Sequence, residues 1–282
     1  AGDIAGEGGS GAVGKNDDFS VVFHGNDHLS DSDLRETTAE ELSGFADSDY
    51  PQAKADDAAF LIEGAYKKEG YAFVKAAYAI NGEKGLGLTF TIVEGPQVLV
   101  SKIVIDGNNA FSDKQLLAFF EEKDSSLLGT GKLIFVESQV RDAVAAIRDL
   151  YTGDGYLQVK IDGPVSQFST DRSRVEVRLT IDEGERITVG AVRFQGDILE
   201  DARKELDELA AQLFGKPFLG RRKLVLRSGV QEIYGNLGYP DVQADIDENR
   251  EAGSSEVNLS CTISSGPQVI IAGIEVVGNT RT

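Results

Sequence analysis

Two histidines and two aspartates near the N-terminal end come nearest to the spacing of a metal site. His24 and His28 flank the turn Gly25-Asn26-Asp27, and Asp31 and Asp33 follow closely. A calcium-binding loop needs a central glycine and a glutamate at its twelfth position, and neither falls in place here. A surface turn is the favoured interpretation, so the sequence predicts no metal site.

The segment Gly129-Thr130-Gly131-Lys132 partly matches a phosphate-binding loop. The full pattern requires glycine at position 126 and serine or threonine after the lysine. Those positions hold Ser126 and Leu133 instead. We therefore predict a turn between two helices in this segment.

The remaining candidates for chemistry are a cysteine and the many carboxylates. A single cysteine, Cys261, excludes an internal disulfide and a multi-cysteine zinc site. It falls on the inward side of an alternating strand pattern, which predicts a small core residue. No two carboxylates fall together in an apolar pattern, as acid–base catalysis would require. The sequence thus predicts no catalytic residues and no cofactor.

One basic cluster stands out, formed by Arg221, Arg222, Lys223 and Arg227. Such a cluster is able to dock a carboxylate-rich partner or lipid headgroups. The alternative is a solvated start of a helix, which is the more common role of such a run. We keep the cluster as a candidate partner patch.

Composition narrows the class of protein. The chain has 282 residues, which predicts about two domains or three small ones, and a formal net charge of −19. That charge repels nucleic acid and anionic membrane surfaces, so we expect no nucleic-acid partner. No apolar run approaches the roughly 20 residues of a membrane-spanning helix. Residues 1–17 are rich in glycine and poor in apolar residues, which predicts a flexible leader.

Three markers recur in the same order, with a period near 85 residues. The first is a glycine after an apolar strand pattern, the second is a Gly-Tyr pair, and the third is a turn glycine after Glu or Ser. They fall at Gly25, Gly107, Gly196 and Gly278; at Gly70-Tyr71, Gly155-Tyr156 and Gly238-Tyr239; and at Gly95, Gly184 and Gly266. Independent recurrence of three markers indicates an internal repeat.

The residue patterns within each repeat predict the same order of elements: strand, helix, helix, strand, strand. Ser30 with Asp33, and Ser112 with Gln115, match the capping box that begins a helix. The glycine of each Gly-Tyr pair is a natural end for the second helix. The last strand alternates apolar and polar residues, which indicates a sheet with one buried face. We predict α+β modules, each a three-stranded mixed sheet packed on two helices, in an elongated arrangement.

The markers also give domain boundaries. We expect a leader at 1–17, repeat 1 at 18–96, repeat 2 at 97–186, repeat 3 at 187–269, and the first strand of a further repeat at 270–282. The full-length polypeptide is therefore expected to continue. Repeat 1 holds 6 basic and 15 acidic residues, a net charge of −9, against −4 for each of the other two repeats. Repeat 1 could attract a basic partner, although a solvated acidic surface is the plainer interpretation.

These repeats resemble the polypeptide-transport-associated (POTRA) domain, which occurs in tandem before the membrane barrel of BamA-like and TamA-like outer-membrane assembly proteins. The resemblance is carried by the Gly-Asn after the first strand, the Gly-Tyr pair, and the Glu-Gly or Ser-Gly that closes the third strand. Repeat 3 departs from the pattern, since Asp197 stands where asparagine is usual.

The resemblance implies that the middle strand of each repeat lies at a sheet edge, and an open edge can accept an extended segment by β-augmentation. We expect these strands at 72–80, 157–162 and 242–246. The candidate client-binding residues are Phe73, Lys75, Ala77, Leu157, Val159, Ile161, Val242, Ala244 and Ile246. Val159→Pro is expected to weaken crosslinking of unfolded barrel peptides, because it removes a ladder donor on the edge. The alternative is that these edges are already covered.

As function, the resemblance implies a periplasmic arm of an outer-membrane protein assembly or translocation factor. Its expected partners are unfolded outer-membrane proteins or peptides, periplasmic chaperones or accessory lipoproteins, and a C-terminal membrane barrel outside this sequence. The expected location is the periplasmic side of the bacterial outer membrane. Two alternatives stay open: the arm of a dedicated two-partner secretion transporter, and a cell-envelope scaffold that binds no client.

Overall fold

A computed structural model describes residues 19–43, 45, 48, 51–81, 87–120, 133–270 and 272–273. The expected leader, the turn at 129–132 and residues 274–282 of the fourth copy lie outside the described residues. None of the helices in the described ranges is long and apolar enough to cross a membrane.

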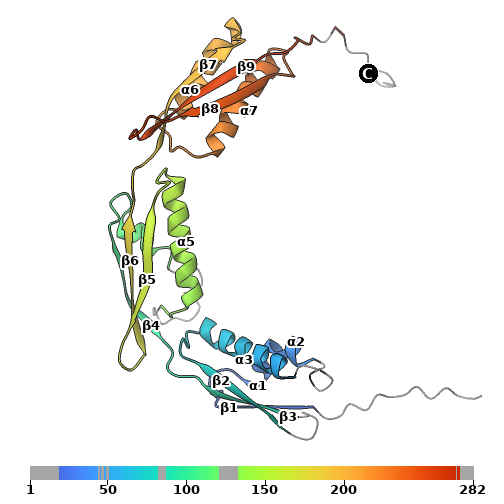
Figure 1. Cartoon of the computed structure of the whole chain (residues 1–282), viewed down its shortest axis with the longest axis vertical. Coiled ribbons are helices and arrows are strands. Elements are labelled where there is room, and N and C mark those ends of the chain that lie inside the picture. The colour runs from blue at the N-terminus through green and yellow to red at the C-terminus, as the bar shows by residue number, and fades with distance from the viewer. Residues whose placement is uncertain are drawn as a thin grey trace, which may run out of the picture. The chain divides into compact units, whose positions relative to one another are not determined.

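Within the described residues, the strands form three separate three-stranded sheets (Figure 1). Their strands are β1 Ser20–His24, β2 Lys75–Asn81 and β3 Gly87–Val93; β4 Leu99–Asp106, β5 Lys160–Phe168 and β6 Arg174–Asp182; and β7 Thr188–Gly196, β8 Gln243–Asn249 and β9 Glu256–Ser264. In every sheet the third strand in sequence lies in the centre, so that the second forms an outer edge. The central strands β3 and β9 pair parallel with the first strand and antiparallel with the second. The predicted mixed α+β fold is confirmed.

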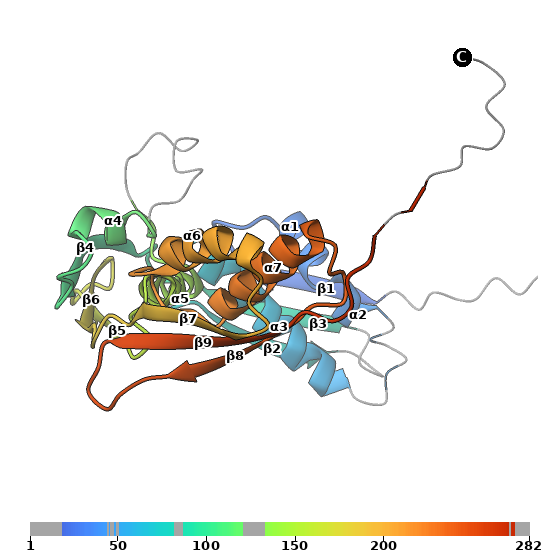
Figure 2. The ribbon, with the colours of Figure 1, turned by 90° about the horizontal axis from the view of Figure 1, so that it is seen from above.

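The described helices follow the first strand of each repeat. They are α1 Asp31–Thr37, α2 Ala39–Leu42, α3 Pro51–Lys68, α4 Asp113–Leu117, α5 Glu137–Gly153, the 3₁₀ turn η3 Glu200–Ala202, α6 Arg203–Leu213 and α7 Arg221–Asn236. Both predicted capping boxes are present, at Ser30 before α1 and at Ser112 before α4. Figure 2 shows α6 and α7 on one face of the sheet formed by β7, β9 and β8.

In repeats 1 and 3 the hydrophobic core combines buried residues of the sheet and of the helices. The alternating residues Val257, Leu259, Cys261 and Ile263 of β9 are buried, as the pattern predicted. Burial raises the pKa of the Cys261 thiol to about 11, as expected of a thiol in an apolar core. The chain divides into two compact parts. The first comprises 1–104, 121–141 and 165–177, and the second comprises 105–120, 142–164 and 178–282. The repeat boundaries stay predictions.

The sequence markers prove to be structural elements of the fold. Gly107 ends β4 with a φ of +91°, and a Cβ atom there would overlap the carbonyl oxygen of Ile181. The Gly-Tyr pair closes the second helix, because the Tyr156 amide donates to the Tyr151 carbonyl over 3.0 Å. The same bond recurs from Tyr71 to Tyr66 and from Tyr239 to Tyr234. These glycines and tyrosines therefore have a structural role in the fold.

Candidate binding edges

The first-strand edges of repeats 2 and 3 are partly closed by the segment that precedes the second helix. In repeat 2, the Val100 amide donates to the Leu133 carbonyl and the Phe135 amide donates to the Val98 carbonyl, each over 2.8 Å. In repeat 3, residues 215–218 make the equivalent bonds with residues 187–189 at the start of β7. In repeat 1, the Arg35 guanidinium donates to the Val21 carbonyl of β1 over 2.5 Å. These contacts reduce what the first-strand edges can offer to another chain.

The β2 edge is more open. The Ala76 amide donates to the Glu63 carboxylate over 3.3 Å, so it faces away from β3. Because the N–H and C=O of one strand residue point to the same side and alternate along the strand, Tyr78 and Ile80 also present their backbone groups outward. Among the described residues, β2 pairs only with β3. An added strand would therefore find donors and acceptors at Tyr78 and Ile80.

Glu63 covers one end of this edge. It extends from α3, which packs against β2, and forms ion pairs with Lys67 at 2.9 Å and Lys75 at 3.9 Å. Partial burial raises the pKa of Glu63, but hydrogen bonds from Lys67 and the Ala76 amide, with the charges of Lys67 and Lys75, outweigh it and lower that pKa overall. The carboxylate thus stays ionised near neutral pH and competes for the outward Ala76 amide.

At the β8 edge a helix side chain again contacts an outward backbone group, but this side chain is positively charged. Arg227 on α7 donates to the Ala244 carbonyl over 3.1 Å, so the backbone groups of Ala244, Ile246 and Glu248 face outward. The intervening Asp245 and Asp247 stand opposite Thr262 and Ser260 of β9. A helix side chain therefore satisfies one outward backbone group in both repeats, an amide in repeat 1 and a carbonyl in repeat 3.

β5 is the corresponding edge strand of repeat 2, and it contains Pro164. Proline has no N–H to donate and is found in sheets chiefly on edge strands and at bulges. Its presence fits the outer position of β5 and removes one donor from this strand. Val165 beside it is 63% exposed.

The sequence-predicted edge residues divide into two groups. Five lie in the edge strands, namely Lys75, Ala77, Ile161, Ala244 and Ile246, and four precede them, namely Phe73, Leu157, Val159 and Val242. The Val159 amide donates to the Tyr156 carbonyl over 3.2 Å, inside the turn that follows the Gly-Tyr pair. A proline at Val159 would therefore disrupt that turn and would not test the edge.

Phe73 has another role within the first compact part of the chain. Its ring packs edge-on against Phe168, with 4.8 Å between ring centroids, and the Arg172 guanidinium lies 4.6 Å above it. An aromatic side chain held in this way packs at the start of the strand and leaves the backbone further along β2 as the candidate edge.

The basic cluster lies at the start of α7, and three of its members have partners. Arg222 donates to the Pro217 carbonyl over 3.3 Å, Lys223 forms an ion pair with Glu248 at 2.6 Å, and Arg227 contacts Ala244. These contacts tie the cluster to residues 215–218, the segment that covers the start of β7, and to β8. Its role as a partner patch stays a prediction.

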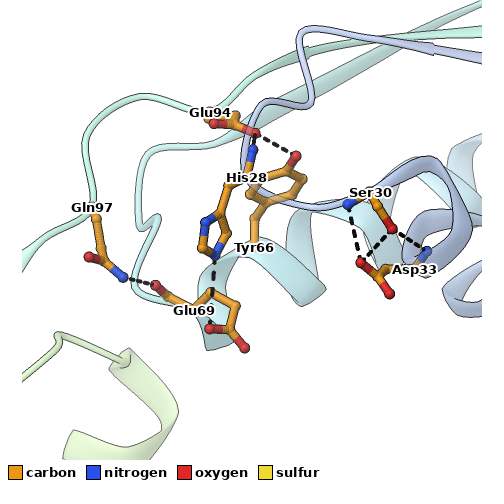
Figure 3. Close-up of polar contacts among 7 residues, drawn as sticks. All are labelled: His28, Ser30, Asp33, Tyr66, Glu69, Glu94 and Gln97. Atoms are coloured by element: carbon orange, nitrogen blue, oxygen red, sulfur yellow. Dashed lines mark hydrogen bonds and ion pairs between the residues drawn. The ribbon is translucent and has the colours of Figure 1, made fainter. Parts of the chain in front are cut away.

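A polar network that the sequence analysis did not predict links Tyr66, Glu94 and His28 in repeat 1 (Figure 3). The Tyr66 hydroxyl donates to the Glu94 carboxylate over 2.6 Å, and the same carboxylate accepts the His28 amide over 2.8 Å. Burial and then this hydrogen bond raise the pKa of Tyr66, which keeps the phenol neutral. Among the described residues no group of three or more His, Cys, Asp or Glu is placed to hold a metal ion.

Repeats 2 and 3 vary the same network. In repeat 2, the Glu183 carboxylate accepts the Tyr151 hydroxyl over 2.9 Å and the Asn109 amide over 2.7 Å. In repeat 3, Ser265 replaces the glutamate, and the carboxylate of Asp197 accepts the Ser265 amide over 3.0 Å. Asp197, in the turn after β7, therefore supplies the negative charge that a glutamate after the third strand supplies in repeats 1 and 2.

Comparison with known proteins fits this architecture. The POTRA family model, described as a surface antigen variable number repeat, matches residues 98–184. The outer membrane protein assembly factor BamA of Neisseria meningitidis is 23% identical over 247 residues, which cover 86% of this chain and 31% of that protein. A putative outer membrane protein assembly factor of Treponema pallidum is 26% identical over 225 residues, which cover 77% of this chain and 26% of that protein.

Among solved structures, POTRA domains 3–5 of Haemophilus influenzae BamA match with 21% identity and a TM-score of 0.40, covering 86% of this chain and 94% of that one. The chain spans between a quarter and a third of the length of the two curated relatives named above. The family model falls on repeat 2, and the same order of strands and helices recurs on both sides of it, so the chain is similar to the POTRA regions of BamA-like outer membrane assembly factors.

Proposed function

We propose that this chain is the periplasmic arm of an outer-membrane protein assembly factor, and that it binds unfolded segments of β-barrel proteins at the second-strand edges of its repeats. Accessory proteins or chaperones are further proposed partners, and a C-terminal membrane barrel is the proposed destination of the client. The relatives named above are assembly factors, which supports the proposed setting.

The observation that carries the proposal is the contrast between the two kinds of edge. The first-strand edges are partly occupied by other backbone or by Arg35, whereas β2 and β8 keep consecutive outward backbone groups at Tyr78 and Ile80 and at Ile246 and Glu248. Each added hydrogen bond contributes about 0.5–1.5 kcal/mol net. Ordering the client costs part of this gain, so each edge would bind weakly and release readily.

Amide exchange tests the proposal without any substitution. Adding a peptide of about 10 residues from an outer-membrane barrel strand is expected to slow exchange of the Tyr78, Ile80, Ile246 and Glu248 amides by about tenfold, because they become ladder donors. The Ala77 and Asp245 amides, which face the central strands, serve as internal controls and should not change. Peptide binding without protection of the outward amides would place the site elsewhere.

Glu63 gives a second prediction. Glu63→Ala removes the carboxylate that occupies the Ala76 amide and is expected to strengthen peptide binding at β2 by a few-fold, because one more donor is then available. Peptide titration followed by the β2 amides measures the effect. Lys67→Ala is the matched control, since it removes an ion-pair partner of Glu63 but leaves the carboxylate in place. Equal or weaker binding by Glu63→Ala would show that Glu63 does not compete with the client.

A further inference from the structure

The helical face of repeat 1 carries a groove that the edge-binding proposal does not use. It lies between α1 and α3 and has a volume of about 530 Å³. Leu29, Phe60, Leu61 and Gly64 supply apolar lining, while Asp33, Lys68 and Glu69 supply charge. The side chain of Phe60 is 73% exposed, and no other phenylalanine among the described residues is as exposed.

The other repeats provide an internal comparison for this groove. Aligning the buried tyrosines Tyr66, Tyr151 and Tyr234 places Phe60 opposite Ala145 and Ser228, and Gly64 opposite Asp149 and Glu232. Repeats 2 and 3 thus have small or charged residues where an exposed helix face is expected to have them. At these aligned positions of the described helices, only repeat 1 combines an exposed aromatic ring with a glycine one turn later.

The fold of repeat 1 gives no reason for Gly64. It lies inside α3, and a Cβ atom added there would meet nothing within 4 Å. Glycine inside a helix destabilises it by roughly 0.5–1 kcal/mol relative to alanine. A glycine that costs stability and leaves a gap beside an exposed phenylalanine allows another backbone to approach closely.

Charge and backbone chemistry define the occupant. α1 and α2 carry exposed or half-buried carboxylates at Asp31, Asp33, Glu36, Glu40 and Glu41, and their single guanidinium, Arg35, is engaged at Val21. Repeat 1 has a net charge of −9. Most of the lining residues lie on α1 and α3, whose helical backbone bonds are already made, so an extended strand would leave most of its own groups unpaired. A helix has no such requirement.

We propose that the groove between α1 and α3 docks a basic amphipathic helix of a partner protein, with an apolar side chain against Phe60 and the helix backbone over Gly64. Lysines or arginines of that helix face Asp33 and Glu69. This is helix-in-groove recognition, and it is independent of strand addition at β2.

The test uses the 282-residue chain and a labelled synthetic helix of about 18 residues, with leucine on one face and lysine on the other. Fluorescence anisotropy is expected to show binding that Phe60→Ala weakens by about tenfold, as removal of a central aromatic anchor does. Gly64→Gln should block the groove while maintaining or raising the thermal midpoint, because glutamine favours helix over glycine. A loss of binding by this variant cannot then come from unfolding.

Two controls make the outcome decisive. Phe214→Ala removes another exposed phenylalanine, 63% exposed in repeat 3, and should bind like the unsubstituted chain. A peptide of the same composition in scrambled order keeps the charge but loses the apolar face, and it should bind at least tenfold more weakly. Equal binding of both peptides, or wild-type binding by both Phe60→Ala and Gly64→Gln, would overturn the proposal.

Discussion

Tyr151→Ala is expected to destabilise repeat 2 by about 3–5 kcal/mol, the cost of removing a fully buried aromatic ring. The ring packs against Phe111 at 4.8 Å and Tyr156 at 5.6 Å between centroids. Because the chain holds three separate sheets, unfolding of the whole chain is not one two-state transition. Exchange of the β6 amides measures the local free energy of opening, which should fall by the stated amount.

The hydroxyl contribution can be separated from that of the ring. Tyr151→Phe removes a hydrogen bond to the Glu183 carboxylate and is expected to cost about 1.5–3 kcal/mol. Tyr234→Phe, at the same position of repeat 3, removes a bond of 2.7 Å to the neutral Asp197 carbonyl and a longer one of 3.4 Å from the Leu199 amide, and should cost about 0.5–1.5 kcal/mol. If the two variants lost equal stability, the charge of Glu183 would not be the source of the difference.

The contribution of Tyr151 to the stability of repeat 2 should decrease at alkaline pH. Burial, followed by the hydrogen bond to Glu183, raises the pKa of Tyr151 above its usual value near 10. A raised pKa means that the folded state favours the neutral phenol. Its contribution to stability is therefore complete below about pH 10 and is lost as the pH rises above that value. Tyr151→Phe should remove this part of the alkaline instability of repeat 2.

The sequence contains local information about this fold in abundance. The capping boxes at Ser30 and Ser112 and the Gly-Tyr helix ends each depend on residues within about one helical turn of each other, so a single sequence reveals them. Alternation in β6 and β9 identifies the central strands for the same reason. The repeat adds confirmation, since each pattern occurs more than once.

Long-range contacts account for what the sequence did not reveal. The resemblance to the POTRA domain predicts edge strands that begin at 72, 157 and 242. In repeats 1 and 2 those residues first form a turn, held by bonds such as Val74 to Tyr71, and β2 begins at Lys75. The hydrogen bond from the Ser265 amide to the Asp197 carboxylate joins residues that are 68 positions apart in the sequence. The hydrogen bond from Arg227 to the Ala244 carbonyl joins a helix to a strand. No local pattern signals either.

Glu248→Pro gives the largest expected effect on client binding at a single edge. Glu248 presents its N–H away from β9, so proline should leave the β8–β9 ladder intact while removing one outward donor and placing a ring in the path of an added strand. We expect binding of a barrel-strand peptide at β8 to weaken by about tenfold. Titration followed by the Ile246 amide measures it, and the β2 edge provides an unaltered reference in the same molecule.

The control for this substitution is Glu248→Ala. Both changes remove the ion pair of Glu248 with Lys223, but alanine keeps the backbone N–H. Because the pair is half-exposed, its loss should contribute little. If alanine and proline weakened binding equally, the peptide would be recognising the side chain or its charge, and strand addition at β8 would be excluded. If only proline acted, the backbone of the edge strand would be the recognised group, and the basic residues at the start of α7 would serve mainly to hold that edge in place.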